Sequence, residues 1–193
     1  MAEPDMMTLR AADSAAMLGY WDLTDTLVDG IDAMRLAGPK YLPQFPAEMN
    51  DNYKFRLAHT TVMTNIFADI VESLSVKPFE KETALVGTDV PQELADFSND
   101  VDGSGNNLSV FAANHFYNAV KSGIDWLFVD YPSVSDEIVT LADAKASNIR
   151  PFWTRILGRN VLEARSKFIV SREQLVYVRI FEPGKPDHVR VME

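Results

Sequence analysis

The sequence contains no cysteine and only three histidines among its 193 residues. Without cysteine, the chain has no disulfide, zinc ribbon, iron–sulfur ligand or thiol nucleophile. It also has no apolar run close to the roughly 18 residues that are needed to cross a bilayer. Its first residues are acidic, whereas a secretory signal peptide begins with basic residues and continues with apolar ones. We therefore expect a globular protein of intracellular origin that is not bound to a membrane.

Basic residues are fewer than acidic ones, and the two kinds are unevenly distributed. Lys and Arg number 18 against 28 Asp and Glu, which gives a net charge of −10. Residues 1–149 hold 9 basic and 23 acidic side chains, a net charge of −14, whereas residues 150–193 hold 9 and 5, a net charge of +4. The overall balance argues against a general nucleic-acid binder. A chain of this length is expected to form a single domain, 1–193.

The first part of the chain, residues 1–76, is expected to form a helical arm with two long helices. The first helix is predicted over residues 13–37, where apolar residues recur every three or four positions. Its apolar stripe consists of Tyr20, Leu23, Leu27, Ile31 and Met34, and the opposite side carries Asp22, Asp25, Asp29 and Asp32. The second helix is predicted over residues 48–74, with Met63, Phe67, Ile70 and Leu74 at helical spacing. An extended, proline-rich connector over residues 41–46 should join the two.

The pattern then changes from helices to strands. Residues 77–148 are expected to form an α/β part, with helices over 91–97, 107–122 and 141–146, a turn-rich stretch over 99–107, and a buried strand over 124–131 that follows Gly123. Residues 149–193 should form a β-rich end, with strands over 150–157, 161–170, 175–181 and 189–192 and a turn over 182–187. The predicted fold class is α+β (mixed α/β), with long N-terminal amphipathic helices, a helix–strand unit and a C-terminal antiparallel β-rich segment.

Two acidic segments have spacings that can bind cations. The aspartates of the first helix lie one helical turn apart and can share a hard cation, but their position opposite the apolar stripe favours a solvated face. Residues 100–105 resemble the front of a calcium loop, yet the twelfth position from Asp100 is Phe111 instead of glutamate. The glycines there are not followed by the Lys-Ser or Lys-Thr of a Walker loop. We expect a tight turn in which Asn106 or Asn107 caps the following helix.

The histidines are His59, His115 and His188, and none has a second ligand type at metal-binding spacing other than scattered acids. No G-x-S-x-G motif places a serine in a catalytic elbow. His115 lies near the apolar face of its predicted helix, which favours a hydrogen-bonded core histidine over a catalytic base. We therefore assign no catalytic residue, no metal ligand and no cofactor-binding residue from these patterns.

The basic end interleaves arginines and lysines with aromatic residues. A surface of this kind fits three roles: contact with phosphate backbones, contact with the acidic front part of a neighbouring copy, or the wet face of a sheet. The sequence leaves these three alternatives open.

Several short segments, taken in order, resemble the amino-terminal part of tailed-bacteriophage and prophage portal proteins. The similarity covers most of residues 20–155. The segments are Trp21-Asp22 with Gly30, residues 37–43, residues 53–57, Asn65 and Phe67, residues 76–79, residues 102–105 with Leu108 and Phe111-Ala112, Gly123 with residues 129–132, and Arg150-Pro151-Phe152. Ala164 departs from the family pattern, where an aromatic residue precedes the arginine. Portal chains are longer, so we expect this chain to be truncated before the stem and clip.

The resemblance implies an outer, wing-type region of a portal and an architectural role, so that the protein is not an enzyme. Portals form a ring, usually of twelve copies, at one capsid vertex of the virion, after synthesis in the bacterial host cytoplasm. The packaging motor (terminase) and head–tail adaptor proteins dock on that ring, and DNA passes through it without sequence-specific binding. An acidic balance would keep such a channel from gripping DNA. Two alternatives remain: a small acidic metal-dependent enzyme, and another phage head or adaptor assembly protein.

The uneven charge adds a prediction about how copies of a ring would meet. In a head-to-tail cyclic assembly, unlike surfaces of adjacent copies are in contact. The basic region would then face the acidic helices of a neighbour. The residues assigned to this inter-subunit charge surface are Asp22, Asp25, Asp29, Asp32, Arg150, Arg155, Arg159 and Arg165.

Overall fold

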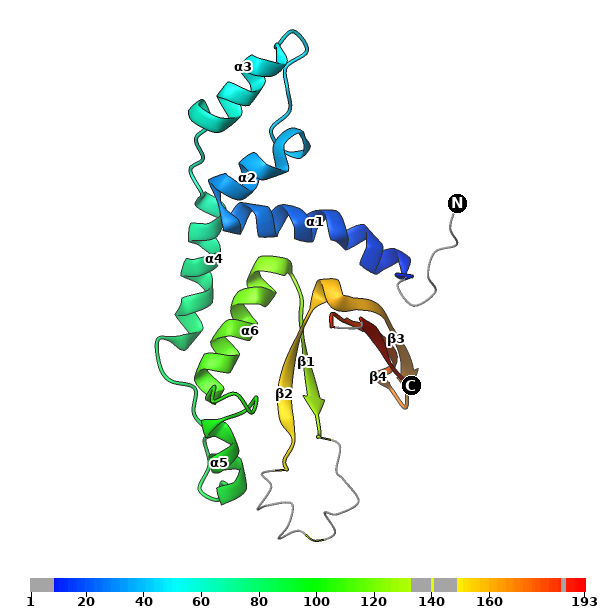
Figure 1. The fold of residues 1–193 in the computed structure, drawn as a ribbon. Coiled ribbons are helices and arrows are strands. Elements are labelled where there is room, and N and C mark those ends of the chain that lie inside the picture. The colour runs from blue at the N-terminus through cyan, green and yellow to red at the C-terminus, as the bar shows by residue number, and fades with distance from the viewer. Residues whose placement is uncertain (1–8, 133–139, 141–148, 185–186) are drawn as a thin grey trace. The chain divides into compact units, whose positions relative to one another are not determined.

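The computed structural model describes residues 9–132, 140, 149–184 and 187–193, and the chain divides into two compact units (Figure 1). The first unit combines Met1–Leu74 with Val161–Glu193, and the second is Ser75–Asn160. The described residues form helices and two antiparallel sheets, which confirms the predicted mixed α+β fold. The expected β-rich end, residues 149–193, is shared between the two units. The helix predicted over 141–146 lies outside the described residues.

The first unit begins with two helices where one was predicted. Helix α1 spans Ala12–Asp29 and helix α2 spans Ile31–Ala37. Gly30 separates them with φ +85°, a conformation that a helix does not contain and that glycine adopts without steric cost. The expected apolar stripe is also only partly packed, because the Tyr20 side chain is 66% exposed. Trp21, which was not in that stripe, is buried instead.

The connector after α2 is not helical, but it is also not extended throughout as predicted, because the Leu42 amide donates back to the Gly38 carbonyl at 2.8 Å and a turn follows at residues 46–47. Arg56 holds the connector in place. A 3₁₀ turn, η1 (Gly38–Lys40), ends α2, and α3 spans Asn50–Phe55 before a π-helical turn, η2 (Arg56–Thr60). The Arg56 guanidinium donates to both Glu48 carboxylate oxygens, at 2.8 and 2.9 Å, and to the Pro43 carbonyl at 3.1 Å. It also lies over the Phe45 ring, 4.7 Å from the centroid. This hydrogen bonding lowers the pKa of Glu48.

The predicted helix over residues 48–74 is wrong in its continuity, since the backbone is extended after Thr61 and helix α4 begins only at Ile66 (Ile66–Val76). Contacts with other parts of the unit stabilise the break. Arg35 donates to the Thr61 carbonyl at 3.0 Å, and the Asn65 amide donates to the Leu27 carbonyl at 2.6 Å. The Asn65 side chain also accepts a hydrogen bond from the Ala68 amide, which caps α4.

The remainder of the first unit is a three-stranded antiparallel sheet in the order β3-β4-β5. Its strands are β3 (Val161–Ile169), β4 (Arg172–Glu182) and β5 (His188–Met192). The base of the sheet is buried, and its core residues are Val161, Leu162, Val178 and Ile180. The start of α1 is tied to this base, because the Ala11 amide donates to the Leu162 carbonyl at 2.9 Å.

The second unit contains α5 (Gln92–Asn99), α6 (Leu108–Ser122) and the antiparallel pair β1 (Asp125–Asp130) and β2 (Phe152–Leu157), after a 3₁₀ turn, η3 (Lys77–Phe79). Asn107 caps α6 by accepting from the Val110 amide, and Gly123 ends it in a left-handed conformation, so both predicted caps are confirmed. The core contains Val101, Phe111 and Ile156. The prediction of a buried β1 is wrong, because alternate side chains of this strand are exposed. None of the described helices combines the length and apolar character that crossing a bilayer requires.

Candidate functional site

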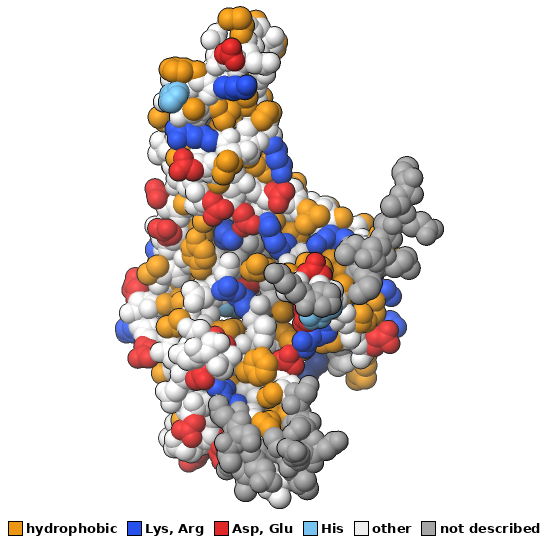
Figure 2. Space-filling view, viewed as in Figure 1, with side chains coloured by type: hydrophobic (Ala, Val, Ile, Leu, Met, Phe, Trp, Pro, Cys, Tyr) orange, Lys and Arg blue, Asp and Glu red, His pale blue; other side chains and the backbone are white. Residues whose placement is uncertain are grey.

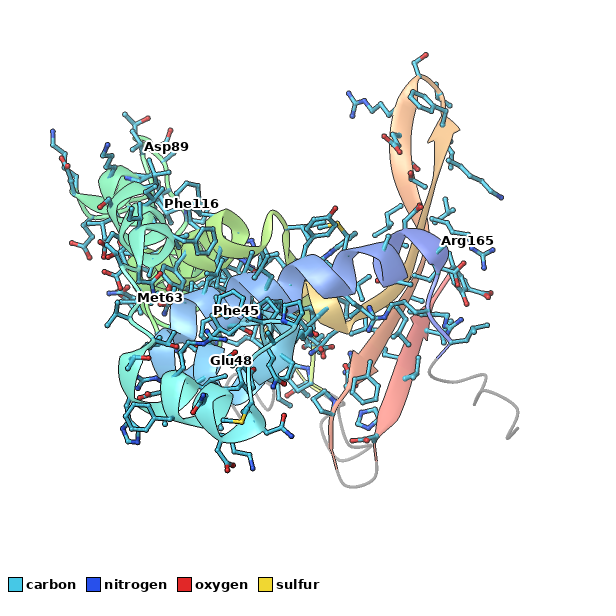
Figure 3. All side chains as sticks on the ribbon, turned by 90° about the horizontal axis from the view of Figure 1, so that it is seen from above. Phe45, Glu48, Met63, Asp89, Phe116 and Arg165 are labelled. Atoms are coloured by element: carbon cyan, nitrogen blue, oxygen red, sulfur yellow. The ribbon has the colours of Figure 1, made fainter. Side chains whose placement is uncertain are left out.

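The β3–β4 hairpin of the first unit exposes apolar side chains at its outer end. Strand β5 pairs with β4 only from Val178 to Glu182, so the outer half of the hairpin is a two-stranded ribbon. In Figure 3 the hairpin extends beyond α1, which belongs to the same unit. An isolated two-stranded ribbon is marginally stable in water. A partner that covers it would therefore contribute to its order.

Apolar side chains gather at the tip of this hairpin, which we define as residues 167–175. Phe168 is 79% exposed, Val170 is 92% exposed and Leu175 is 52% exposed. Phe168 pairs with Glu173, and Ser166 pairs with Leu175, so Phe168 and Leu175 share one face of the ribbon. Exposed apolar side chains that lie together on a protruding element are typical of protein interfaces.

The turn at the tip has an unfavourable sequence for its geometry. Ile169 pairs with Arg172, which leaves Val170 and Ser171 as a two-residue loop. Their φ angles are +46° and +65°, the left-handed values of a type I′ turn. Asn-Gly is the favoured sequence there, and a β-branched residue such as valine rarely adopts a positive φ. Backbone strain of this kind gathers at functional positions, where the surroundings keep it in place.

The second unit carries a groove of mixed apolar and polar lining, which we call the α5–α6 groove. It is lined by residues 82–85, Val90, the α5 residues Ala95, Ser98 and Asn99, and the start of α6, and its volume is about 410 Å³. Its apolar lining includes Leu85, Val90 and Leu108. The segment at its edge is attached to α6, because the Thr83 amide donates to the Ser109 hydroxyl at 2.7 Å.

The surroundings of the α5–α6 groove are acidic. Residues 80–96 contain five acidic side chains and one basic one, a net charge of −4. The acidic residues are Glu80, Glu82, Asp89, Glu93 and Asp96, and all five are exposed. Glu82 lines the groove itself. A basic and apolar partner would therefore match this site better than an acidic one.

The candidate calcium loop uses its carboxylates to hold its own backbone. Asp102 accepts hydrogen bonds from the Ser104 amide at 2.9 Å and from the Asn106 side chain at 2.7 Å. Partial burial alone would raise the pKa of Asp102, but these hydrogen bonds bring it below its ordinary value. Asp100 accepts from the Gly105 amide at 2.9 Å and from Arg150 at 2.7 Å. The structure therefore confirms the predicted tight turn.

A histidine, an aspartate and an arginine meet in the second unit, and the arginine, Arg155, also lines a second, more polar groove. His115 Nδ1 lies 3.0 Å from Asp125 Oδ2, and Arg155 Nε lies 3.8 Å from the same oxygen. The Asp125 side chain is 1% exposed, and burial raises its pKa against the opposing effect of the His115 and Arg155 charges. The groove has a volume of about 330 Å³ and is lined by Asp102, Asn114, Trp153 and Arg155, among others. His115 is thus half-buried beside Asp125, and its Nδ1 has an ionic neighbour without a hydrogen bond to any described residue, which differs from the expected hydrogen-bonded core histidine.

The acidic members of the predicted charge surface all lie on the helices of the first unit. Asp22 pairs with Lys40 at 2.9 Å, and Asp32 pairs with Arg35 at 3.2 Å. Asp29 is exposed, and Asp25 is half-buried.

The basic members are divided between the units and have acidic neighbours of their own. Arg150 pairs with Asp100, Arg155 lies near Asp125, and Arg159 lies in a 3₁₀ turn, η4 (Gly158–Asn160), all in the second unit. Arg165 belongs to the first unit, where it pairs with Glu163 at 2.7 Å. Much of this charge is thus neutralised within the chain, and the role of these residues between subunits stays a prediction.

The apolar surface of the helical arm adds to that of the hairpin. Figure 2 shows apolar side chains at the surface of the upper part of the molecule, between charged ones. The exposed apolar residues of the arm include Leu36, Phe45, Met49, Phe55 and Val62. These residues follow no single helical face, which distinguishes them from the compact tip of the hairpin.

Sequence reasoning missed both the hairpin tip and the α5–α6 groove. The predicted strands ended at Val170 and resumed at Leu175, because no Asn-Gly or Asp-Gly marks the true turn. The run Phe168-Ile169-Val170 at a strand end was the available signal for an exposed apolar tip. The groove depends on Leu85 and Val90, which lie in a segment without periodicity and meet α6 only in the folded unit.

Among the described ranges, no group of three or more His, Asp or Glu side chains is placed to hold a metal ion. No protein-family model matches this chain, and no curated protein matches it. The features that bear on function are thus the exposed hairpin tip, the α5–α6 groove and the series of short sequence segments between Trp21 and Phe152.

Proposed function

We propose that this chain is a structural subunit of a phage or prophage portal, the ring at the capsid vertex through which DNA is packaged and ejected. In this proposal the chain is not an enzyme and needs no cofactor. Its partners are further copies of itself, the capsid, the packaging motor and the head–tail adaptor. It is made in the host cytoplasm and ends up in the virion.

The observation that carries the proposal is the projecting hairpin with its exposed apolar tip. Phe168 and Val170 are exposed on an element that the rest of its unit does not cover. A subunit whose role is to assemble needs such a surface, whereas water disfavours it on a protein that acts alone. The short sequence segments that resemble portal proteins, and that occur in the same order, support a portal ring as the kind of assembly. The net charge of −10 further supports a channel that lets DNA pass without holding it.

The test is the mass and shape of the assembled protein. Native mass spectrometry and negative-stain microscopy on the longest natural form of the chain should show closed rings of one stoichiometry, about 12 copies by the family resemblance. Monomers at every concentration would contradict the proposal. Rings that bind the head–tail junction without binding the packaging motor would favour an adaptor instead. Marked thermal stabilisation by Mg²⁺, Mn²⁺ or Ca²⁺ would favour the metal-dependent enzyme.

A further inference from the structure

We infer that the tip of the β3–β4 hairpin of one copy docks into the α5–α6 groove of a neighbouring copy. This inference rests on the proposed function, because it specifies the contact through which copies of the chain associate. The tip contributes Phe168, Val170 and Leu175, and the groove contributes Leu85, Val90 and Leu108.

The groove offers apolar side chains to the apolar tip, and polar residues line the rest of it. The tip is a narrow two-stranded ribbon that ends in a tight turn, and its apolar side chains are exposed on it. The groove is open to solvent, and its volume of about 410 Å³ lies within the range of pockets that accept apolar groups. An aromatic side chain that enters such a pocket is the usual centre of an interface, with polar residues around it. Phe168 is therefore the expected anchor.

Their charges are also complementary. The tip, residues 167–175, carries Lys167 and Arg172 against one acidic residue, Glu173, which gives it a net charge of +1. Neither of these basic side chains forms a salt bridge with any residue in the described ranges. Residues 80–96, which surround the groove, carry a net charge of −4, and the first acidic residues of this segment are Glu80 and Glu82. Opposite charges at the rim of an apolar contact fix its orientation and speed its formation.

The location of the two surfaces determines the kind of assembly they produce. The tip belongs to the first unit and the groove to the second, so a contact between two copies uses a different surface on each. Such a heterologous contact leaves one tip and one groove free, and each can bind a further copy. If the rotation between neighbours closes, the product is a ring. A second copy of this chain is thus an occupant that supplies the apolar, basic tip and also extends the assembly.

Charge reversal on each side tests the contact. The tip variant is Lys167→Glu with Arg172→Glu, and the groove variant is Glu80→Lys with Glu82→Lys. Sedimentation velocity over a concentration series should show at least a tenfold weaker association constant for each variant. Lys54→Glu with Lys77→Glu changes the net charge as the tip variant does, at exposed positions outside both surfaces, and should leave association unchanged. Circular dichroism checks that every variant is folded.

Combining the variants shows whether the contact lies between copies. All four substitutions in one chain should restore association to within a few-fold of the original protein. An equimolar mixture of the tip variant and the groove variant should also associate, because each reversed tip meets a reversed groove on the other variant. Phe168→Ser should weaken association at least tenfold, whereas Phe168→Leu, which keeps an apolar side chain, should have a much smaller effect.

The possible failures have different meanings. Normal association by both charge variants and by Phe168→Ser would overturn the docking contact and leave the proposed ring intact. Loss of association with no rescue in the mixture would also overturn it. Association through the tip into open filaments or closed pairs would support the contact and contradict the portal ring. A protein that is monomeric at all concentrations would overturn both.

Discussion

Asp125 is a buried carboxyl group in the second unit, with a histidine and an arginine beside it. Its carboxyl group is almost fully enclosed, and its charged neighbours are His115 at 3.0 Å and Arg155 at 3.8 Å. Burial disfavours the ionised carboxylate, whereas the two neighbours favour it, and the outcome is a raised pKa. Ionised Asp125 therefore lowers the free energy of unfolding instead of increasing it.

We predict that this effect appears in the pH dependence of stability. The folded state holds the Asp125 proton to a higher pH than the unfolded state, whose pKa is the ordinary 3.8. As pH rises through the window between 3.8 and the raised pKa, the original protein should lose stability relative to Asp125→Asn, which cannot ionise. The difference should amount to about 1.4 kcal/mol for each unit by which the pKa is raised.

Urea unfolding of both proteins between pH 4 and 8 measures this difference. Asp51→Asn, the same change at an exposed aspartate on α3, is measured alongside as the control for the loss of one carboxyl group. A flat difference for Asp125→Asn would show that its pKa is not raised.

The role of a single residue could be predicted from the sequence where its hydrogen-bonding partner is close to it in the chain. Asn107 and Gly123 act as caps through groups three or four residues away, so their roles follow from the sequence around them. His115 was expected to be a hydrogen-bonded core histidine, whereas it is half-buried beside Asp125, a neighbour that the local sequence does not indicate. The two meet because the strand after Gly123 lies against α6, which is a tertiary contact.

Among the elements, the β3–β4 hairpin gives the clearest prediction. Val170→Asn with Ser171→Gly should stabilise the protein by about 0.5–1 kcal/mol, because both new residues adopt a positive φ more readily. Thermal unfolding measures the gain, and hydrogen exchange of the outer strand amides should locate it in the hairpin. Ser171→Ala, which does not relieve the turn, is the control. Unchanged stability and exchange would show that the turn is not strained.

The connector before α3 gives a second prediction at this scale. Arg56→Lys keeps the charge but loses the planar fork that binds both oxygens of Glu48 and lies over Phe45. Limited proteolysis should therefore cut the connector over residues 41–49 faster in this variant, and its melting temperature should fall. Lys54→Arg, at an exposed position on α3, should behave as the original protein. Equal cleavage rates would contradict the role assigned to Arg56.

The two long helices show why elements were predicted better than their ends. Periodicity identified helical segments correctly but continued them through Gly30 and through Thr61. Both breaks depend on groups distant in sequence or on glycine's freedom at a positive φ, and the Thr61 carbonyl is satisfied by Arg35. Apolar spacing continued across these positions, so the pattern alone could not locate them.

At the scale of the whole molecule, we predict that self-association depends on salt. Raising NaCl from 50 to 500 mM should weaken association several-fold, because exposed charges are screened over distances above the Debye length. The tip variant, which has already lost the complementary charges, should show a flatter dependence. Sedimentation at each salt concentration provides the measurement. Association that is equally strong or stronger at high salt would mean that charge complementarity does not contribute.

The division into two units was beyond sequence reasoning for a physical reason. Strand β2 was grouped with the strands that follow it, because all four have similar β-rich patterns. In the structure β2 pairs with β1 and belongs to the second unit, while β3–β5 complete the first. Strand pairing is decided by which faces can be buried together, and strand patterns do not carry that information.

The interrupted path of the chain also affects how the protein is made. The first unit needs both ends of the sequence, since Ala11 bonds to Leu162 and Arg179 donates to the Leu9 carbonyl at 2.6 Å. During synthesis, the helical arm cannot make these contacts until strands β3 and β4 have left the ribosome. Closing the loop between Leu74 and Val161 costs about 4 kcal/mol if that segment is unstructured, and less once the second unit has folded. The second unit, which lies in sequence between the two segments of the first, is therefore suited to fold first and to bring those two segments together.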